Sequence, residues 1–503
     1  MRIFTYQLLN ILALCSYAQP DPFQRHIEQN GALILQQFKE LLSIPNVAYD
    51  LGNINKNANY IKVQLDARGV QTKLLRTIGA PPIVFGYLPQ PKSKRTLAFY
   101  VHYDGQPVDL AKWTHSPWDP VLYDGLISEG GNQVPFPKYG DTINEELRIY
   151  GRSAGDDKAP IISILNALDV IRSNKLNITS NLVFFFEGQE EAGSKNLRNY
   201  LQDNRELIDK IDLWMFCDGP VHQSRKPQLV FGVRGVTGFE MTVYGPNRPL
   251  HSGHYGNWAP VPGQMLSTLI SSMKDENGNV VIEGFYDDVQ PLTTREIEAM
   301  AAAPNIDEAL KRELGLVGTE GNETLYERLL YPSLTVKGIA SGNTGNLARN
   351  VIPATATATM GIRLVKGCKP EKMIDLVESH IQKQGYHLVR DDPDQTARLR
   401  YPKICKIERR TSGYPAARTS MNNPHAQDVV GAVRQIAGDD LVLLPTLGGS
   451  LPLYLFTDVL QKPAIIVPIA NHDNNQHAPD ENLRIANLWY GIRLMGKLMT
   501  MEN

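Results

Sequence analysis

The stretch LVFFFEGQEEAGS, residues 182–194, decides the fold. An apolar run of strand length ends abruptly in the acids Glu187, Glu190 and Glu191. A strand that is apolar throughout is typical of a parallel sheet covered on both faces, and ligands gather beyond the carboxyl ends of such strands. We therefore expect Glu190 and Glu191 on the rim of a cleft.

The adjacent pair Glu190 and Glu191 indicates a metal site. Two carboxylates held close together raise each other's pKa unless a cation lies between them. The alternative is a solvated acidic loop, and this stretch alone does not decide between the two.

Residues that bind metals also follow two other predicted strands. His102 and Asp104 follow a strand at 96–100, and Asp218 follows a strand at 211–216. His102 and Asp104 are two apart at a strand end, so both side chains can project to the same side. A hydrogen-bonded His/Asp couple without a metal is the alternative for this pair.

Two further candidates lie beside predicted elements of the same kind. Asp156 and Asp157 precede a helix predicted over 159–174, where one acid would suffice to cap the helix. The second acid therefore indicates another role. His477 comes after a buried strand predicted over 464–468.

Together these positions supply two imidazoles and three carboxylates. Such a set suits a pair of Zn²⁺ ions if one carboxylate bridges ions ~3.5–4 Å apart. A water between the ions would lose its proton near neutral pH and attack a polarised carbonyl, and Glu190 would carry the proton to the leaving nitrogen. The expected metal ligands are His102, Asp156, Glu191, Asp218 and His477.

Length and composition set limits on the class of protein. With 503 residues the chain is too long for one ordinary domain, and two domains are expected. A net charge of -2 and the lack of a basic run argue against a nucleic-acid partner. No segment reaches the roughly 18 apolar residues that a membrane span requires.

The N-terminus predicts export. Arg2 precedes an apolar run that ends in small residues near Ala18, so we expect a signal peptide over residues 1–18, with an ordinary amphipathic helix as the alternative. Its removal would leave three cysteines, an odd number that implies no disulfide framework. Export without disulfides favours a secreted or periplasmic protein in a bacterial context.

The pattern changes along the chain in a way that predicts an insertion. A strand of alternating polarity at 236–244 opens a region of strands and helices typical of an α+β domain, although 275–341 shows little regular strand. The first pattern returns near residue 411. We expect a catalytic domain made of 19–234 and 411–503, with 235–410 inserted.

Seven short motifs occur together along the chain: HYD at 102–104, GRSAGDDK at 151–158, EGQEEAGS at 187–194, DG at 218–219, LHSG at 250–253, GGS at 448–450 and HAPDE at 477–481. In these motifs the chain resembles the M20 metallopeptidases, the group of carboxypeptidase G2, succinyl-diaminopimelate desuccinylase and carnosinase-type dipeptidases. The segments GFYDDVQPLT at 284–293 and YPSL at 331–334 are most similar to the carnosinase-type branch. The resemblance implies a zinc-exopeptidase-like α/β/α catalytic domain with an inserted α+β sandwich that serves as lid and dimerisation domain.

The resemblance also implies how the metals are shared. Asp156 bridges the two ions, His102 and Asp218 complete one site, and Glu191 and His477 complete the other. Zn²⁺ is the expected metal, two ions per subunit, with Mn²⁺ or Co²⁺ as alternatives.

Other side chains receive catalytic roles from the resemblance. Glu190 is the general base, and Asp104 orients His102 through its other ring nitrogen. His251 reaches the active site of the partner in a homodimer and stabilises the oxyanion there. His254 receives no role.

The resemblance further implies a carboxylate clamp for the substrate. Arg363, Gly449 and Ser450 match positions that hold a substrate carboxylate with a guanidinium and backbone amides. The Asp156–Asp157 peptide bond is expected to be cis.

These observations predict a dinuclear zinc exopeptidase that cleaves dipeptides or short peptides. The alternative within the enzyme class is an N-acyl amino acid amidohydrolase, which needs the same metals and the same clamp. A metal-dependent binding or scaffold protein would lack the general base, whereas Glu190 is present.

Overall fold

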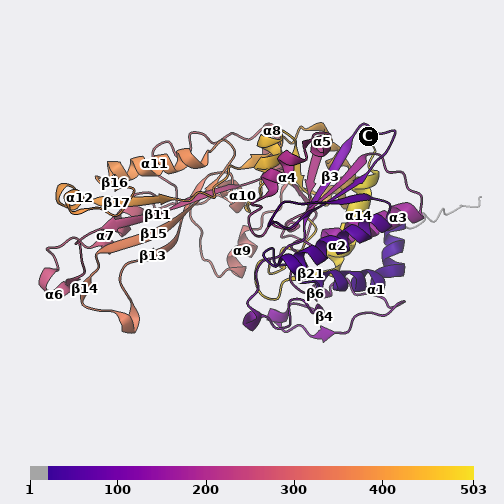
Figure 1. Cartoon of the computed structure of the whole chain (residues 1–503), viewed down its shortest axis with the longest axis horizontal. Coiled ribbons are helices and arrows are strands. Elements are labelled where there is room, and N and C mark those ends of the chain that lie inside the picture. Colours follow the sequence, from indigo (N-terminus) through magenta and orange to yellow (C-terminus); the bar gives the residue numbers. More distant parts are fainter. Residues whose placement is uncertain (1–20, 503) are drawn as a thin grey trace, which may run out of the picture.

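The computed structural model describes residues 21–502, and these form two lobes. A broad body lies at the right of Figure 1, and an elongated lobe built from the middle of the chain extends to the left. The predicted signal peptide over residues 1–18 lies outside the described residues.

The body is built on an eight-stranded sheet whose central strands are parallel. Its order is β1-β2-β7-β3-β8-β20-β9-β19, and β3 pairs in parallel with both β7 and β8. The edge pairs β1–β2 and β2–β7 are antiparallel. The strands are β1 (Gln71–Leu75), β2 (Ile83–Leu88), β3 (Thr96–His102), β7 (Asn181–Glu187), β8 (Leu213–Phe216), β9 (Gln228–Val230), β19 (Val442–Leu444) and β20 (Ala464–Ile466).

Helices cover both faces of this sheet, which confirms the predicted α/β/α layering. Alternate residues of β3 point to opposite faces, so Phe99 packs in one core and Tyr100 in the other. One face carries α1 (Pro22–Leu42), α2 (Leu51–Ala67), α3 (Ala159–Ser173), α13 (Pro424–Ala437) and α14 (Ile485–Thr500). The other carries α4 (Leu197–Asp203), α5 (Arg205–Ile208) and a π-helical turn over Leu455–Val459.

A small four-stranded sheet fixes the loops beside the central strands. Its order is β21-β6-β4-β5, so it joins a strand near the C-terminus to one that precedes Asp156. The strands are β4 (Val121–Tyr123), β5 (Gln133–Val134), β6 (Arg148–Tyr150) and β21 (Asn482–Arg484). A two-stranded sheet pairs β10 (Gly232–Val233) with β18 (Ala417–Arg418).

The elongated lobe holds a five-stranded sheet in the order β13-β15-β11-β17-β16. The hydrophobic core of this lobe, the third in the molecule, lies between this sheet and two helices, α7 and α11. At the far tip β12 pairs with β14 beside α6 (Figure 1). The bounds are α6 (Ser252–Tyr255), α7 (Pro262–Ser271), α11 (Pro370–Lys383), α12 (Gln395–Arg400), β11 (Gly235–Tyr244), β12 (Leu250–His251), β13 (Ser333–Ala340), β14 (Val351–Ile352), β15 (Thr355–Leu364), β16 (His387–Val389) and β17 (Ile404–Arg409).

The segment 275–341 differs from the prediction, because it ends in a full strand, β13. A register shift between Val336 and Gly338 breaks the alternation that would reveal this strand in the sequence. Before it come three short helices that link the lobes, namely α8 (Thr294–Ala302), α9 (Asp307–Glu313) and α10 (Leu325–Arg328).

Two further sequence predictions bear on the described residues. None of the helices in residues 21–502 combines the length and apolarity needed to cross a bilayer. Cys217, Cys368 and Cys405 are all buried and free.

Candidate metal centre

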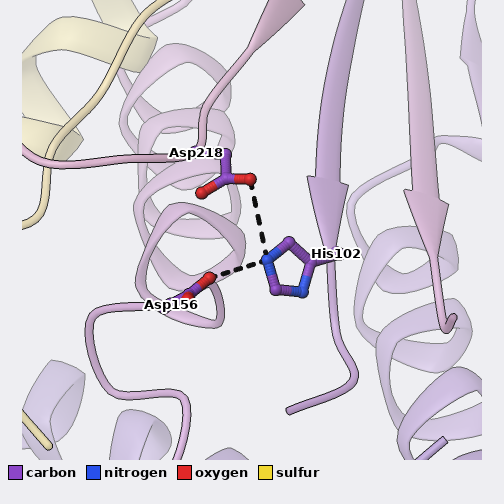
Figure 2. Close-up of side chains that lie close together, drawn as sticks. All are labelled: His102, Asp156 and Asp218. Atoms are coloured by element: carbon purple, nitrogen blue, oxygen red, sulfur yellow. Dashed lines mark hydrogen bonds and ion pairs between the residues drawn. The ribbon is translucent and has the colours of Figure 1, made fainter. Parts of the chain in front are cut away.

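One group of potential ligands gathers where β3 and β8 end. His102 is the last residue of β3, and its Nε2 lies 2.8 Å from Asp156 Oδ1 and 3.8 Å from Asp218 Oδ2. Figure 2 shows this one nitrogen of His102 facing both carboxylates. All three side chains are buried, so the group is shielded from bulk water.

A second group shares Asp156 with the first. Asp156 Oδ2 lies 3.0 Å from His477 Nε2, which in turn lies 3.2 Å from Glu191 Oε2. In each group the ligand atoms lie within 4.8 Å of one another. The two oxygens of Asp156 therefore face two different clusters, as a bridging carboxylate must.

Two of the three acids in these groups, Glu191 and Asp218, resist ionisation in the absence of a cation. Although burial opposes it, hydrogen bonds with His102 and His477 lower the pKa of the shared Asp156. Burial, reinforced by Asp156, raises the pKa of Glu191 to about 9 and that of Asp218 to about 6. Although burial opposes it, hydrogen bonds to Asp104 and Asp156 raise the pKa of His102. A divalent cation would remove this conflict by favouring the ionised carboxylates and neutral imidazoles. The donor set therefore fits metal ions.

Asp104 lies beside the other ring nitrogen of His102 and also contacts the loop after β7. His102 Nδ1 lies 3.1 Å from the backbone oxygen of Asp104 and 3.6 Å from its carboxylate Oδ1. The carboxylate accepts the backbone N–H groups of Glu190 and Glu191, each at 3.0 Å. Asp104 thus links the end of β3 to the loop after β7 and positions ligands of both groups.

The loop that carries Asp156 is held by a buried acid, Glu481. Its carboxylate accepts the backbone N–H groups of Ser153, Gly155 and Asp156 at 2.9–3.0 Å and pairs with Arg152 at 2.7 Å. In the same loop the Asp156–Asp157 peptide bond is cis, as the resemblance implies. Glu481 belongs to the HAPDE motif, but sequence reasoning assigned it no role.

Two glutamines also contact the ligand oxygens, and the sequence predicts neither contact. Gln476 donates to Asp156 Oδ2 at 2.7 Å, and Gln106 donates to Glu191 Oε2 at 2.8 Å. The sequence gives one signal for Gln476, its position directly before His477.

The expected clamp residues lie in the same cavity as the ligands. This cavity has a volume of about 660 Å³. It is lined by Asp156, Glu190, Asp218 and His477, and also by residues 448–451. Arg363, at the end of β15, donates to the Ser450 hydroxyl. Further lining residues that sequence reasoning missed are His222, Leu325, Tyr326, Leu329 and His472.

His251 does not reach this cavity within the chain. It lies in β12 at the tip of the elongated lobe, next to α6, whereas β3 lies in the body (Figure 1). Its Nδ1 accepts the backbone N–H of Gly253, and its ring lies 4.5 Å from that of His254.

The fold and this donor set define the chain as a metal-dependent hydrolase of the peptidase class. Peptidase family M20/M25/M40 matches residues 98–501, and the chain belongs to this family. The match spans the body and the elongated lobe alike.

The sequences of individual relatives align with 83–93% of this chain. The Cys-Gly metallodipeptidase DUG1 of Candida albicans is 27% identical over 93% of this chain and 94% of its own length. The human Beta-Ala-His dipeptidase is 25% identical over 83% of this chain and 77% of its own. Among solved structures, the M20 family metallo-carboxypeptidase Sso-CP2 from Sulfolobus solfataricus has a TM-score of 0.72 and 28% identity, covering 93% of this chain and 98% of that one.

The predicted secreted or periplasmic location in a bacterial context is wrong. The relatives that match 93–95% of the chain include the Cys-Gly metallodipeptidases of three yeasts, which are eukaryotes. The prediction rested on one arginine and a short apolar run, a pattern too common at N-termini to fix a location.

Proposed function

We propose that this protein is a dinuclear zinc dipeptidase. The observation that carries the proposal is the placement of the two Asp156 oxygens, 2.8 Å from His102 Nε2 on one side and 3.0 Å from His477 Nε2 on the other. Relatives described as Cys-Gly and Beta-Ala-His dipeptidases support dipeptides as substrates. Imidazole and carboxylate ligands in this ratio support zinc over magnesium or calcium.

The proposed reaction assigns a task to each group around the cavity. Bound zinc would polarise the scissile carbonyl and lower the pKa of a water molecule. Glu190, which lines the cavity beside Asp156 and Asp218, takes up the proton of the attacking water and gives it to the leaving amine. Asp104 holds the backbone of Glu190 in place for this transfer.

The substrate carboxylate defines the orientation in the cavity. Arg363 presents a planar guanidinium next to the Ser450 hydroxyl, and Gly449 lines the same cavity, where its backbone N–H would be a further donor. We call Arg363, Gly449 and Ser450 the carboxylate clamp. It would hold the C-terminal carboxylate of a dipeptide while the peptide carbonyl faces the metal ligands.

We also propose a homodimer formed through the inserted domain, residues 235–410, in which His251 serves the partner's site. Exposed apolar side chains near the lobe tip support an interface, with Trp258 80% and Leu347 63% exposed. β13 is the edge strand of the five-stranded sheet, and such an edge pairs readily with another chain.

A metal-reconstitution assay tests the function. Metal-free protein is loaded with Zn²⁺, Mn²⁺ or Co²⁺ in turn and offered free dipeptides, including Cys-Gly, beside N-acetyl and N-succinyl amino acids. We expect zinc-dependent release of free amino acids from the dipeptides. Preferential turnover of the acylated set would instead identify an N-acyl amino acid amidohydrolase, and no turnover with any metal would leave a binding protein.

A further inference from the structure

Two leucines separate the candidate active-site cavity from a second cavity. Leu325 begins α10, and Leu329 directly follows its last residue. Both line the cavity of about 660 Å³ that holds Asp156, and both also line a neighbouring cavity of about 400 Å³. Residues four apart lie on one face of a helix, so Leu325 and Leu329 form a single wall, here called the leucine partition.

The leucine partition is held from both lobes. The Tyr326 hydroxyl is hydrogen-bonded to His222 Nε2 in the body. Arg328 Nη1 and Nη2 donate to the side-chain oxygen of Asn279 at 2.9 Å and to the backbone oxygen of Asn277 at 3.0 Å. These contacts on either side of α10 fix the position of the two leucines between the cavities.

The leucine partition stands directly behind the carboxylate clamp. A Cβ atom added at Gly448 would lie 3.3 Å from Leu329 Cδ2, so Leu329 packs against the turn that carries two clamp residues. The third clamp residue, Arg363, is opposite Ser333 in the β13–β15 register, and Ser333 lines the second cavity. The wall therefore closes the end of the cavity where the substrate's C-terminus would lie.

The second cavity offers a cation for an anionic chain end. Arg234 lines it and is only 6% exposed. Its Nη2 donates to the backbone oxygen of Tyr331 at 2.7 Å, while its Nε has no hydrogen-bond partner within residues 21–502. Burial, and then the charge of Arg363, lower the pKa of Arg234 to about 10. A carboxylate arriving in this cavity would relieve both effects.

We infer that the leucine partition sets the length of the substrate. It excludes any residue beyond the one that follows the scissile bond, so the enzyme cleaves dipeptides and rejects peptides extended at their C-terminus. This inference rests on the proposed dipeptidase function. Truncating the two leucines would join the cavities and let an extended C-terminus reach Arg234.

The test compares Ala-Leu with the extended peptide Ala-Leu-Phe in wild-type protein and in L325A/L329A. Initial rates are followed by mass spectrometry, because release of Leu-Phe reports a cut after alanine and release of free Phe does not. In L325A/L329A we expect the ratio of kcat/KM for the cut after alanine in Ala-Leu-Phe to kcat/KM for Ala-Leu to rise about tenfold or more above the wild-type ratio. Apolar walls discriminate between substrates on that scale. Phe-Ala-Leu is extended at its N-terminus instead. The ratio of kcat/KM for its cut between alanine and leucine to kcat/KM for Ala-Leu should stay at the wild-type value.

Matched variants keep the outcome decisive. L310A removes the same atoms from a residue that lines only the second cavity and should leave the ratio unchanged. L325A alone, at a side chain that is 38% exposed, provides a variant that folds if the double one does not. Wild-type protein that releases Leu-Phe as readily as it cleaves Ala-Leu, or partition variants with an unchanged ratio, would overturn the inference. Wild-type protein inactive on Ala-Leu and every other dipeptide would instead defeat the proposed function, and the inference with it.

Discussion

The buried carboxylate of Glu481 accepts the backbone N–H of Asp156 over 2.9 Å. Glu481 therefore positions the residue that both ligand groups share, without lying in either group. We expect E481Q to weaken metal binding about 10- to 100-fold, because partners of metal ligands contribute on that scale. Loss of its charge also leaves Arg152 buried without an ion pair, which should destabilise the fold by about 3 kcal/mol.

Calorimetric metal titration and thermal unfolding of the metal-free protein measure the two effects separately. D480N is the matched control, since the neighbouring Asp480 binds Thr114 rather than the loop at 152–156. If E481Q bound metal as tightly as the wild type, the loop would hold Asp156 in place without the Glu481 carboxylate.

Two neighbouring glutamates should give different defects. Glu190 is assigned the proton transfer, so E190Q should lower kcat by about 10²–10⁴ while both ions remain bound. Glu191 lies 3.2 Å from His477 Nε2 in a ligand group, so E191Q should lose one ion of the two. Metal content by elemental analysis, measured beside kcat, separates the defects. Equal metal loss in the two variants would contradict the division of roles.

The residues at which the central strands end could be predicted from the sequence, because the pattern that marks them is local. The parallel strands β3, β7 and β8 are apolar runs that stop at polar residues, and their carboxyl ends meet at one edge of the sheet. That pattern predicts His102 and Asp218 in one neighbourhood, and the structure brings them into one ligand group.

Other parts of the site could not be predicted, since they depend on contacts between distant segments. Glu481 meets the loop at 152–156 only after β21 pairs with β6. Leu325 and Leu329 look like ordinary helix residues until the two cavities on either side of α10 are known.

The acid Glu187 should make stability fall as the pH rises. Burial raises its pKa from 4.5 to about 7, against a hydrogen bond donated by Tyr100. The folded state therefore keeps a proton that the unfolded chain loses, so this contribution is complete below pH 4.5 and is lost as the pH rises through 7. At about 1.4 kcal/mol per pH unit the loss amounts to roughly 3 kcal/mol.

E187Q should remove this dependence, because glutamine still accepts from Tyr100 and does not ionise. Unfolding midpoints of metal-free wild type and E187Q, measured from pH 4.5 to 8, should diverge with rising pH in favour of the variant. E206Q, at an exposed position of α5, should follow the wild type. Parallel curves for E187Q and wild type would show that Glu187 ionises normally in the folded protein.

His251 provides the sharpest test of the proposed dimer. It lies at the tip of the elongated lobe, away from the cavity that holds Glu190, so within one chain it has no part in the chemistry. If it serves the partner subunit, H251A and E190Q should each be inactive alone but should complement each other when mixed. A mixed dimer contains one complete site, in which an intact Glu190 meets the partner's intact His251.

Random exchange of subunits at equal concentrations makes half of the dimers mixed, so we expect about a quarter of wild-type activity. Light scattering on the same samples reports whether dimers form. Native mass spectrometry, with one variant carrying a mass tag, reports the fraction of mixed dimers and so separates a failed exchange from a failed role. H254A mixed with E190Q is the control, because the ring of His254 lies 4.5 Å from that of His251 but has no assigned task. Dimers that exchange subunits and stay inactive would place the function of His251 outside the partner's site.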